Sequence, residues 1–112
     1  VPTATVADSI CVDVPRNGFH ALSQLKTYGG DIITVTDEQI LQAQAHLSST
    51  TGLFTEPAGA ASFAGFLKYA PQLEPDDLVV VLTTGNGLKD SASAGRTVEV
   101  PDKLISNIDD IL

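Results

Sequence analysis

Residues 79–90 read Val-Val-Val-Leu-Thr-Thr-Gly-Asn-Gly-Leu-Lys-Asp, an unbroken apolar run that passes directly into a small polar loop. An apolar run without polar alternation is typical of a β-strand that is covered on both faces. In open α/β sheets, ligands bind at the carboxyl ends of strands, and Gly85 and Gly87 let a backbone approach a ligand closely. Thr84 adds a neutral hydroxyl at the same point. The stretch therefore predicts a buried strand and a candidate binding loop, with a plain turn as the alternative interpretation of the loop alone.

The rest of the chain alternates between strand-like and helix-like patterns. β-Branched residues predict two further strands, at 9–14 and 31–35. Helical spacing of apolar residues and helix start signals predict four helices, at 17–28, 36–51, 57–69 and 101–112. This alternation indicates an α/β architecture with an at least partly parallel sheet flanked by helices. We expect a single α/β fragment that spans residues 1–112.

Two of the predicted helices begin with specific signals. Residues 36–39 match a capping box, in which the Thr36 hydroxyl accepts from the Gln39 amide and the Gln39 side chain reaches back. Pro57 suits a first helical turn because its φ angle is fixed. Glu56 lies just before that turn. Its carboxylate is therefore expected either to cap the free amides of the helix or to face a binding site.

The composition argues against several kinds of partner. The formal net charge of −8 would repel nucleic-acid phosphate and anionic membrane surfaces. No apolar run approaches the ~20 residues of a membrane span. The two histidines, His20 and His46, lie on different predicted helices and have no metal-ligand spacing. We therefore expect no nucleic acid, no membrane and no metal ion as partners.

Cys11 is the only cysteine of the chain. A lone cysteine cannot form an internal disulfide, which fits a reducing compartment and predicts a cytoplasmic location. Its apolar neighbours, Ile10 and Val12, favour a thiol that is buried in the core rather than a nucleophile.

Four stretches of the chain resemble one family of enzymes; they are residues 7–10, 29–38, 51–61 and 81–90. Residues 51–61 match the run G-(I/L)-F-x-E-P-A-(G/S)-A-A, and residues 84–90 are similar to the signature T-G-H-G-L-K-D. The sequence thus resembles the C-terminal part of the threonine synthases and, more widely, the tryptophan synthase β-like superfamily of fold type II pyridoxal-phosphate enzymes. Asn86 stands where many of the synthases have histidine.

The resemblance implies a reaction and a cofactor. Threonine synthases convert O-phospho-L-homoserine and water to L-threonine and phosphate, using pyridoxal 5'-phosphate as an electron sink. By motif, Thr84 is the residue whose hydroxyl contacts the pyridine nitrogen of the cofactor. Ser9 occupies the position that backs one face of the ring, and Glu56 is expected near the same pocket without an assigned role.

The resemblance also implies that parts of the enzyme are missing from this stretch. The lysine that binds the cofactor covalently and the loop that holds its phosphate lie upstream in this family. None of Lys26, Lys68, Lys89 and Lys103 matches the motif of that lysine. We therefore expect no catalytic residue in this chain, no covalently bound cofactor and no activity of the chain alone. A chain that begins at Val1 without methionine is expected to be a processed, excised or incomplete piece, which self-associates or pairs with the upstream part.

Two other interpretations remain open from the sequence. The run at 51–61 is shared with serine and threonine dehydratases, so a dehydratase-like enzyme piece is one alternative. A non-catalytic, stand-alone α/β module is the other, because the chain lacks the lysine. The stretch at 84–90 favours the threonine synthases.

Overall fold

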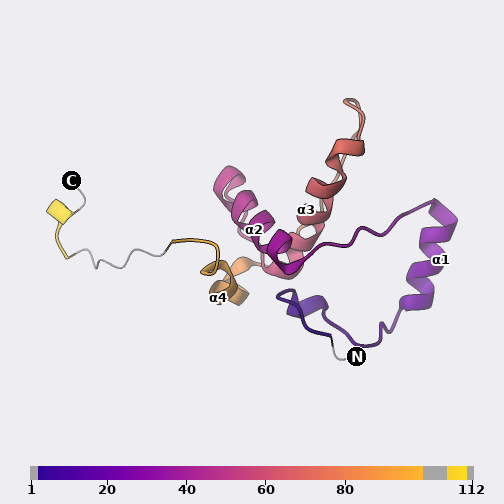
Figure 1. The fold of residues 1–112 in the computed structure, drawn as a ribbon, viewed down its shortest axis with the longest axis horizontal. Coiled ribbons are helices and arrows are strands. Elements are labelled where there is room, and N and C mark those ends of the chain that lie inside the picture. Colours follow the sequence, from indigo (N-terminus) through magenta and orange to yellow (C-terminus); the bar gives the residue numbers. More distant parts are fainter. Residues whose placement is uncertain (1–2, 100–105, 111–112) are drawn as a thin grey trace.

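The computed structural model of the chain describes residues 3–99 and 106–110. These residues form four α-helices, α1 (Gly18–Tyr28), α2 (Asp37–Thr51), α3 (Pro57–Tyr69) and α4 (Ser91–Ala94) (Figure 1). Four short 3₁₀ turns accompany them, η1 (Asp8–Ile10), η2 (Ala70–Gln72), η3 (Gly87–Asp90) and η4 (Ile108–Asp110). The helices predicted at 17–28, 36–51 and 57–69 are confirmed. Most of the helix predicted at 101–112 lies outside the described residues, and η4 is the part that is described.

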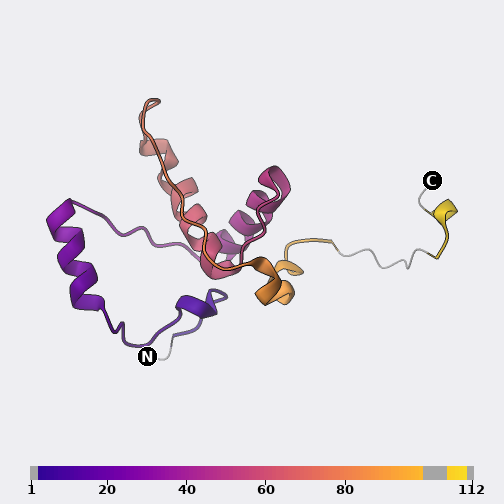
Figure 2. The same cartoon turned by 180° about the vertical axis from the view of Figure 1, so that it is seen from behind.

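The core lies where α2 and α3 converge. The two helices spread from this point like the arms of a V (Figures 1 and 2). Alanine dominates the core, and small side chains let the two backbones approach closely. The buried apolar cluster consists of Ala7, Ile40, Ala43, Ala58, Ala60 and Ala64.

The predicted capping box at the start of α2 is confirmed. The Thr36 hydroxyl accepts from the Gln39 amide at 3.3 Å, and the Gln39 side-chain oxygen accepts from the Thr36 amide at 2.9 Å. Gly52 ends α2 in the left-handed conformation, with φ at 76°. Because only glycine adopts this conformation without cost, the chain can leave α2 and turn towards α3.

The N-terminal segment is attached to the first turn of α2. The Asp37 carboxylate accepts from the Val6 amide at 3.1 Å and from the Thr5 hydroxyl. Ala7 is buried in the core directly after these contacts. This attachment brings η1, which contains Ser9, close to α3.

The three segments predicted as strands form no sheet in the described part of the chain. Residues 9–14 include the end of η1, whereas 31–35 and 79–82 carry no ladder of backbone hydrogen bonds. A strand needs a neighbour for its N–H and C=O groups. Residues of the segments 31–35 and 79–82 instead line an open hollow of about 620 Å³ beside α3. The described residues therefore do not show the predicted sheet: the apolar pattern is present, but no neighbouring strand lies beside it among them.

Side chains of α3 hold two of these segments in place. The Ser62 hydroxyl donates to the Leu82 carbonyl at 2.8 Å, and the Lys68 ammonium donates to the Thr34 carbonyl at 2.7 Å. Both segments therefore lie beside α3.

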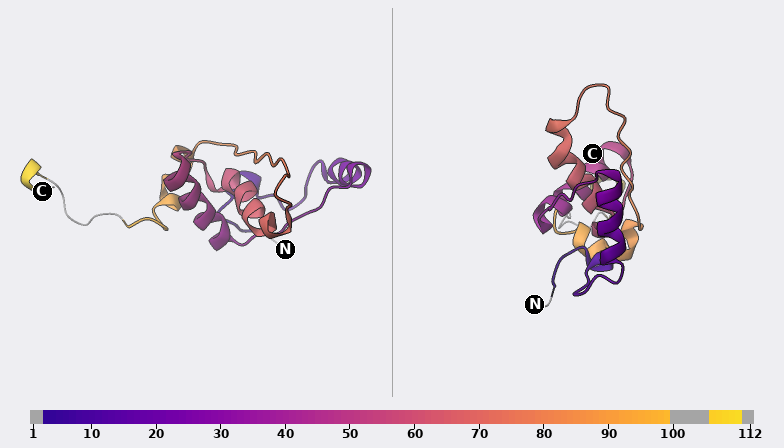
Figure 3. Two further views of the ribbon diagram at one scale, coloured as in Figure 1. Left: turned by 90° about the horizontal axis from the view of Figure 1, so that it is seen from above. Right: turned by 90° about the vertical axis from the view of Figure 1, so that its right-hand side faces the viewer.

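The described residues form an open structure. The radius of gyration is 17.6 Å, whereas a compact chain of this length has about 13 Å. Helix α1 stands apart from the V of α2 and α3 (Figure 3) and buries none of its residues, so that Phe19 is 94% exposed. Val80 is likewise 83% exposed. The apolar stripe of α1 and the run at 79–82 are thus surfaces without a covering layer.

Cys11 differs from its prediction. The thiol is partly exposed and lies 3.1 Å from the Thr3 hydroxyl rather than in the core. The reason is that η1 turns the chain at the residues that were expected to form a buried strand. Both histidines lie on the surface. Among the described helices, none is long and apolar enough to cross a membrane.

We expect Thr36→Ala to lower the free energy of unfolding of the chain by about 1 kcal/mol, because the capping box loses its side-chain acceptor. Urea unfolding followed by far-UV circular dichroism measures this change. Thr50→Ala is the matched control, since the Thr50 hydroxyl only bonds back to the His46 carbonyl within α2. The capping box would be unimportant if both variants had the stability of the unmodified chain.

Candidate functional site

Glu56 lies at the centre of the candidate site. It occupies the position before the first turn of α3 and is only 5% exposed. Its carboxylate makes no capping hydrogen bond to α3. Instead, Oε2 accepts from the Ser9 hydroxyl at 3.2 Å and forms an ion pair with the Lys89 ammonium at 2.8 Å. The carboxylate therefore joins three segments that are far apart in the sequence.

The backbone around Glu56 pairs with the loop that follows the apolar run. Thr55 and Asn86 form an isolated antiparallel bridge. The Glu56 amide donates to the Gly85 carbonyl, and the Gly87 amide donates to the Phe54 carbonyl, both at 3.1 Å. These two bonds fix the 84–87 loop against the entrance to α3.

Thr55 strengthens this pairing from the buried side. Its hydroxyl lies 2.6 Å from the Thr84 carbonyl and 2.8 Å from the Gly85 carbonyl, so its single proton is shared between them. The Thr55 carbonyl in turn accepts from the Gln44 side-chain amide at 2.7 Å. Gln44 is only 1% exposed, and its Oε1 atom has no partner among the described residues.

Thr55 and Gln44 were not predicted as site residues. For Gln44 a signal exists in the sequence: it lies four residues after Ile40 and therefore on the buried face of α2. A polar residue at a core position requires a hydrogen-bond partner. That partner, the Thr55 carbonyl, is supplied by tertiary structure.

Thr84 presents a free hydroxyl on a fixed backbone. Its carbonyl is held by Thr55, while its side chain is exposed and has no partner among the described residues. Of the three predicted site residues, the structure joins Ser9 and Glu56 directly. It places the Thr84 backbone beside them, because Gly85 contacts Glu56.

Two glycines are required for this close packing. A Cβ atom on Gly59 would overlap the Thr84 carbonyl and the Thr55 hydroxyl. A Cβ atom on Gly85 would overlap the Glu56 carboxylate, and Gly85 also has a positive φ of 56°. The glycines of both sequence motifs therefore make room for the partner motif.

Asn86 and Asp90 order the turn that carries Lys89. The Asn86 side-chain oxygen accepts from the Leu88 amide at 2.9 Å and caps η3. The Asp90 carboxylate accepts from the Ser93 amide at 3.0 Å and caps α4. Hydrogen bonds from Ser93 hold the pKa of Asp90 below its ordinary value. Asn86 thus has a local structural role at the position where the related signature has histidine.

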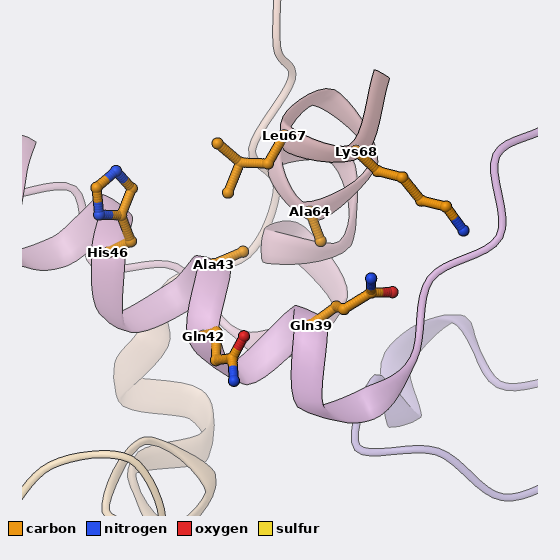
Figure 4. A pocket seen from close by; sticks show the side chains of 7 residues that line it. All are labelled: Gln39, Gln42, Ala43, His46, Ala64, Leu67 and Lys68. Carbon is orange, nitrogen blue, oxygen red and sulfur yellow. The ribbon is translucent and has the colours of Figure 1, made fainter. Parts of the chain in front are cut away.

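A separate cavity of about 450 Å³ lies between α2 and α3 (Figure 4). Gln39 and His46 line it from α2, and Leu67 and Lys68 line it from α3. It includes none of the residues predicted for the cofactor site. Among the described residues, no group of three or more histidine, cysteine, aspartate or glutamate side chains is arranged to hold a metal ion.

Comparison with known proteins identifies the family. Residues 1–85 match the family model described as pyridoxal-phosphate dependent enzyme. The chain belongs to this family. The cofactor of this family is pyridoxal phosphate, as predicted.

Individual relatives narrow the similarity to the threonine synthases. The chain is 40% identical over 102 residues to the threonine synthase of Methanocaldococcus jannaschii, covering 89% of this chain and 25% of that protein. It is 41% identical over 109 residues to the threonine synthase of Methanosarcina acetivorans, covering 96% of this chain and 27% of that protein. It is 36% identical over 105 residues to the threonine synthase of Halalkalibacterium halodurans, covering 92% of this chain and 30% of that protein. The predicted resemblance to the C-terminal part of threonine synthases is confirmed, and the chain spans between a quarter and a third of these relatives.

The described residues fit one end of this cofactor. A pyridine nitrogen can accept from a hydroxyl that is not already engaged, and the Thr84 hydroxyl is exposed, has no partner among the described residues and lies on a backbone held by Thr55. A hydroxyl placed in this way suits contact with the cofactor ring. Of the described lysines, Lys68 donates to the Thr34 carbonyl and Lys89 pairs with Glu56.

We expect Gly59→Ala to lower the free energy of unfolding by about 1–3 kcal/mol, because the new methyl group forces the Thr84 loop away from α3. Gly65→Ala is the matched control in the same helix. No atom lies within 4 Å of a Cβ built on Gly65, so this variant should gain roughly 0.5–1 kcal/mol from helix propensity. Urea unfolding of the two variants should give changes of opposite sign, and equal changes would contradict the close approach at Gly59.

We expect the α4 cap to loosen when the pH falls through the pKa of Asp90. The folded pKa is lowered, so the cap stabilises the turn above the ordinary pKa of about 3.9 and is lost at lower pH. A carboxyl NMR titration should give a pKa below that value, with the Ser93 amide shift following the same curve. In the Asp90→Asn variant the side chain can still cap α4 but cannot titrate. The pH-dependent change in the Ser93 amide shift should therefore disappear. An Asp90 pKa at or above the ordinary value would contradict the cap.

Proposed function

We propose that this chain forms the pyridine-ring side of the cofactor site in a threonine synthase, which converts O-phospho-L-homoserine and water to L-threonine and phosphate. The observation that carries the proposal is the exposed Thr84 hydroxyl, which has no partner among the described residues and lies on a backbone fixed by Thr55 and Glu56. It is supported by the 40% identity to a threonine synthase over nearly the whole chain. Bound pyridoxal phosphate supplies an electron sink that stabilises negative charge on the substrate carbon atoms.

Thr84 would hold the ring nitrogen through a neutral group. A carboxylate at this position would favour a proton on that nitrogen, whereas a hydroxyl does not. The site would therefore moderate the electron sink, which suits elimination and replacement at the substrate. Ser9, held by Glu56 on η1, would lie against one face of the ring and limit its tilt.

The uncovered segments support pairing with the rest of such an enzyme. Residues 31–35 and 79–82 lie beside α3 and form no ladder of backbone–backbone hydrogen bonds in the described part of the chain. Most of the apolar run at 79–82 is also exposed. We infer that further strands complete a partly parallel, fold type II sheet here. The covalent lysine and the phosphate loop would belong to that part. Self-association is the competing way to cover the same face. A cytoplasmic location belongs to the same proposal, supported by the single unpaired cysteine.

We expect Thr84→Asp to lower kcat of the complete enzyme by about 10- to 100-fold, because a carboxylate changes the protonation of the ring nitrogen. Thr84→Ser is the matched control and should retain most activity, since it keeps the neutral hydroxyl. Release of phosphate from O-phospho-L-homoserine, with L-threonine measured in parallel, gives the rate.

Two outcomes decide between the interpretations. Unchanged kcat in Thr84→Asp would contradict the role of Thr84. An enzyme that deaminates L-serine but releases no phosphate from O-phospho-L-homoserine would be a dehydratase.

We expect the 112-residue chain alone to form no covalent link with pyridoxal phosphate, because the proposed covalent lysine belongs to the remaining part of the enzyme. Borohydride reduction of the chain with pyridoxal phosphate should therefore leave its mass unchanged. A stable adduct at one lysine would contradict the assignment of the covalent lysine to the remaining part.

A further inference from the structure

The Glu56–Lys89 ion pair lies at the junction of the candidate site, and its two ends differ in exposure. The Glu56 side chain is 7% exposed, whereas the Lys89 side chain is 59% exposed. A buried carboxylate is unfavourable unless it is paired and hydrogen-bonded. Lys89 and the Ser9 hydroxyl supply these two interactions to the same oxygen, Oε2. The burial of Glu56 therefore depends on both partners.

Glu56 holds the binding loop at two points. Its backbone amide donates to the Gly85 carbonyl, which directly follows Thr84 in the chain. Its carboxylate pairs with Lys89, four residues further along. Between these points, the Gly87 amide donates to the Phe54 carbonyl. The loop that carries Thr84 is thus attached to the entrance of α3 at both of its ends.

The same carboxylate also holds η1. Ser9 donates to Glu56 Oε2, the atom that pairs with Lys89. Gly85 makes this arrangement sterically possible, because a Cβ atom there would occupy the space of the carboxylate. One residue therefore connects η1, through its carboxylate, with the loop that follows Thr84, through its carboxylate and its backbone amide.

We propose that Glu56 and Lys89 are positioning residues whose ion pair closes the loop of residues 84–89 on η1, so that Thr84 and Ser9 face one ligand. The proposal rests on the proposed function for the identity of that ligand as the ring of pyridoxal phosphate. The closure itself is a property of the protein without cofactor. Neither residue takes part in the reaction; each acts through Thr84 and Ser9.

Amide hydrogen exchange on the complete protein without cofactor tests the closure. Lys89→Met and Glu56→Gln should each speed exchange of the Gly87 amide by about tenfold, because opening of the loop becomes less costly. The double variant should exchange no faster than the faster single variant, since both changes remove one interaction. Lys89→Arg keeps the cation and should restore most of the protection.

Lys68→Met is the matched control. Lys68 also bonds to a distant segment, through the Thr34 carbonyl, but it does not contact the loop. The Gly87 amide of the Lys68→Met variant should exchange at the same rate as that of the unmodified protein. If Glu56→Gln fails to fold, the comparison of Lys89→Met, Lys89→Arg and Lys68→Met still decides the closure. Equal Gly87 exchange in Lys89→Met and the unmodified protein would overturn the proposal.

Binding of pyridoxal phosphate, followed by its fluorescence, tests the positioning role. The dissociation constant should rise about tenfold in Lys89→Met and recover in Lys89→Arg. A loop that opens without weakening the binding would overturn positioning and leave only a stabilising contact. An unmodified protein that binds no pyridoxal phosphate would refute the proposed function instead, and the exchange measurement would still decide whether the ion pair closes the loop.

Discussion

The candidate site depends on one short contact, the pairing of residues 54–56 with residues 85–87. Two backbone hydrogen bonds make this contact, and the Thr55 hydroxyl reinforces it from the buried side. It joins a helix entrance to a loop about thirty positions away in the sequence. Without it, Thr84 would lie on a free loop, and Glu56 would be a charged residue at an ordinary helix start. Backbone bonds that form without a ligand order part of the site in advance, which reduces the cost of binding.

Small residues are the condition for this contact. Gly59 lets the first turn of α3 touch the Thr84 carbonyl, and the alanines on either side keep α3 close to α2. The motif at 51–61 is therefore a packing motif as much as a chemical one. Its glycine and alanines bring the backbones together, and its threonine and glutamate then satisfy the polar groups that this close approach buries.

Local signals in the sequence were sufficient for the helices, whereas pairing between distant segments was not predictable. The capping box at Thr36 and the proline at position 57 fixed two helix starts within a residue, because they act within one turn. The apolar run at 79–82 indicated a strand, but a strand exists only beside another one, and that neighbour is absent from the described residues. The grouping of Ser9 and Glu56 followed from the family motifs. The ion pair with Lys89 and the bond from Gln44 to Thr55 arise from tertiary contacts.

The distribution of large and small side chains explains why the site is ordered in an otherwise open structure. Five of the six residues in the buried cluster are alanine, whereas Phe19, Val80 and Leu82 are exposed. Full burial of one such large side chain contributes about 1.5–3 kcal/mol, so a covering layer would add more apolar stabilisation than the alanine core supplies. The pairing of 54–56 with 85–87 and the contacts of Glu56 need no such layer, because their partners all lie within the chain. These contacts of the candidate site can thus form within the chain itself.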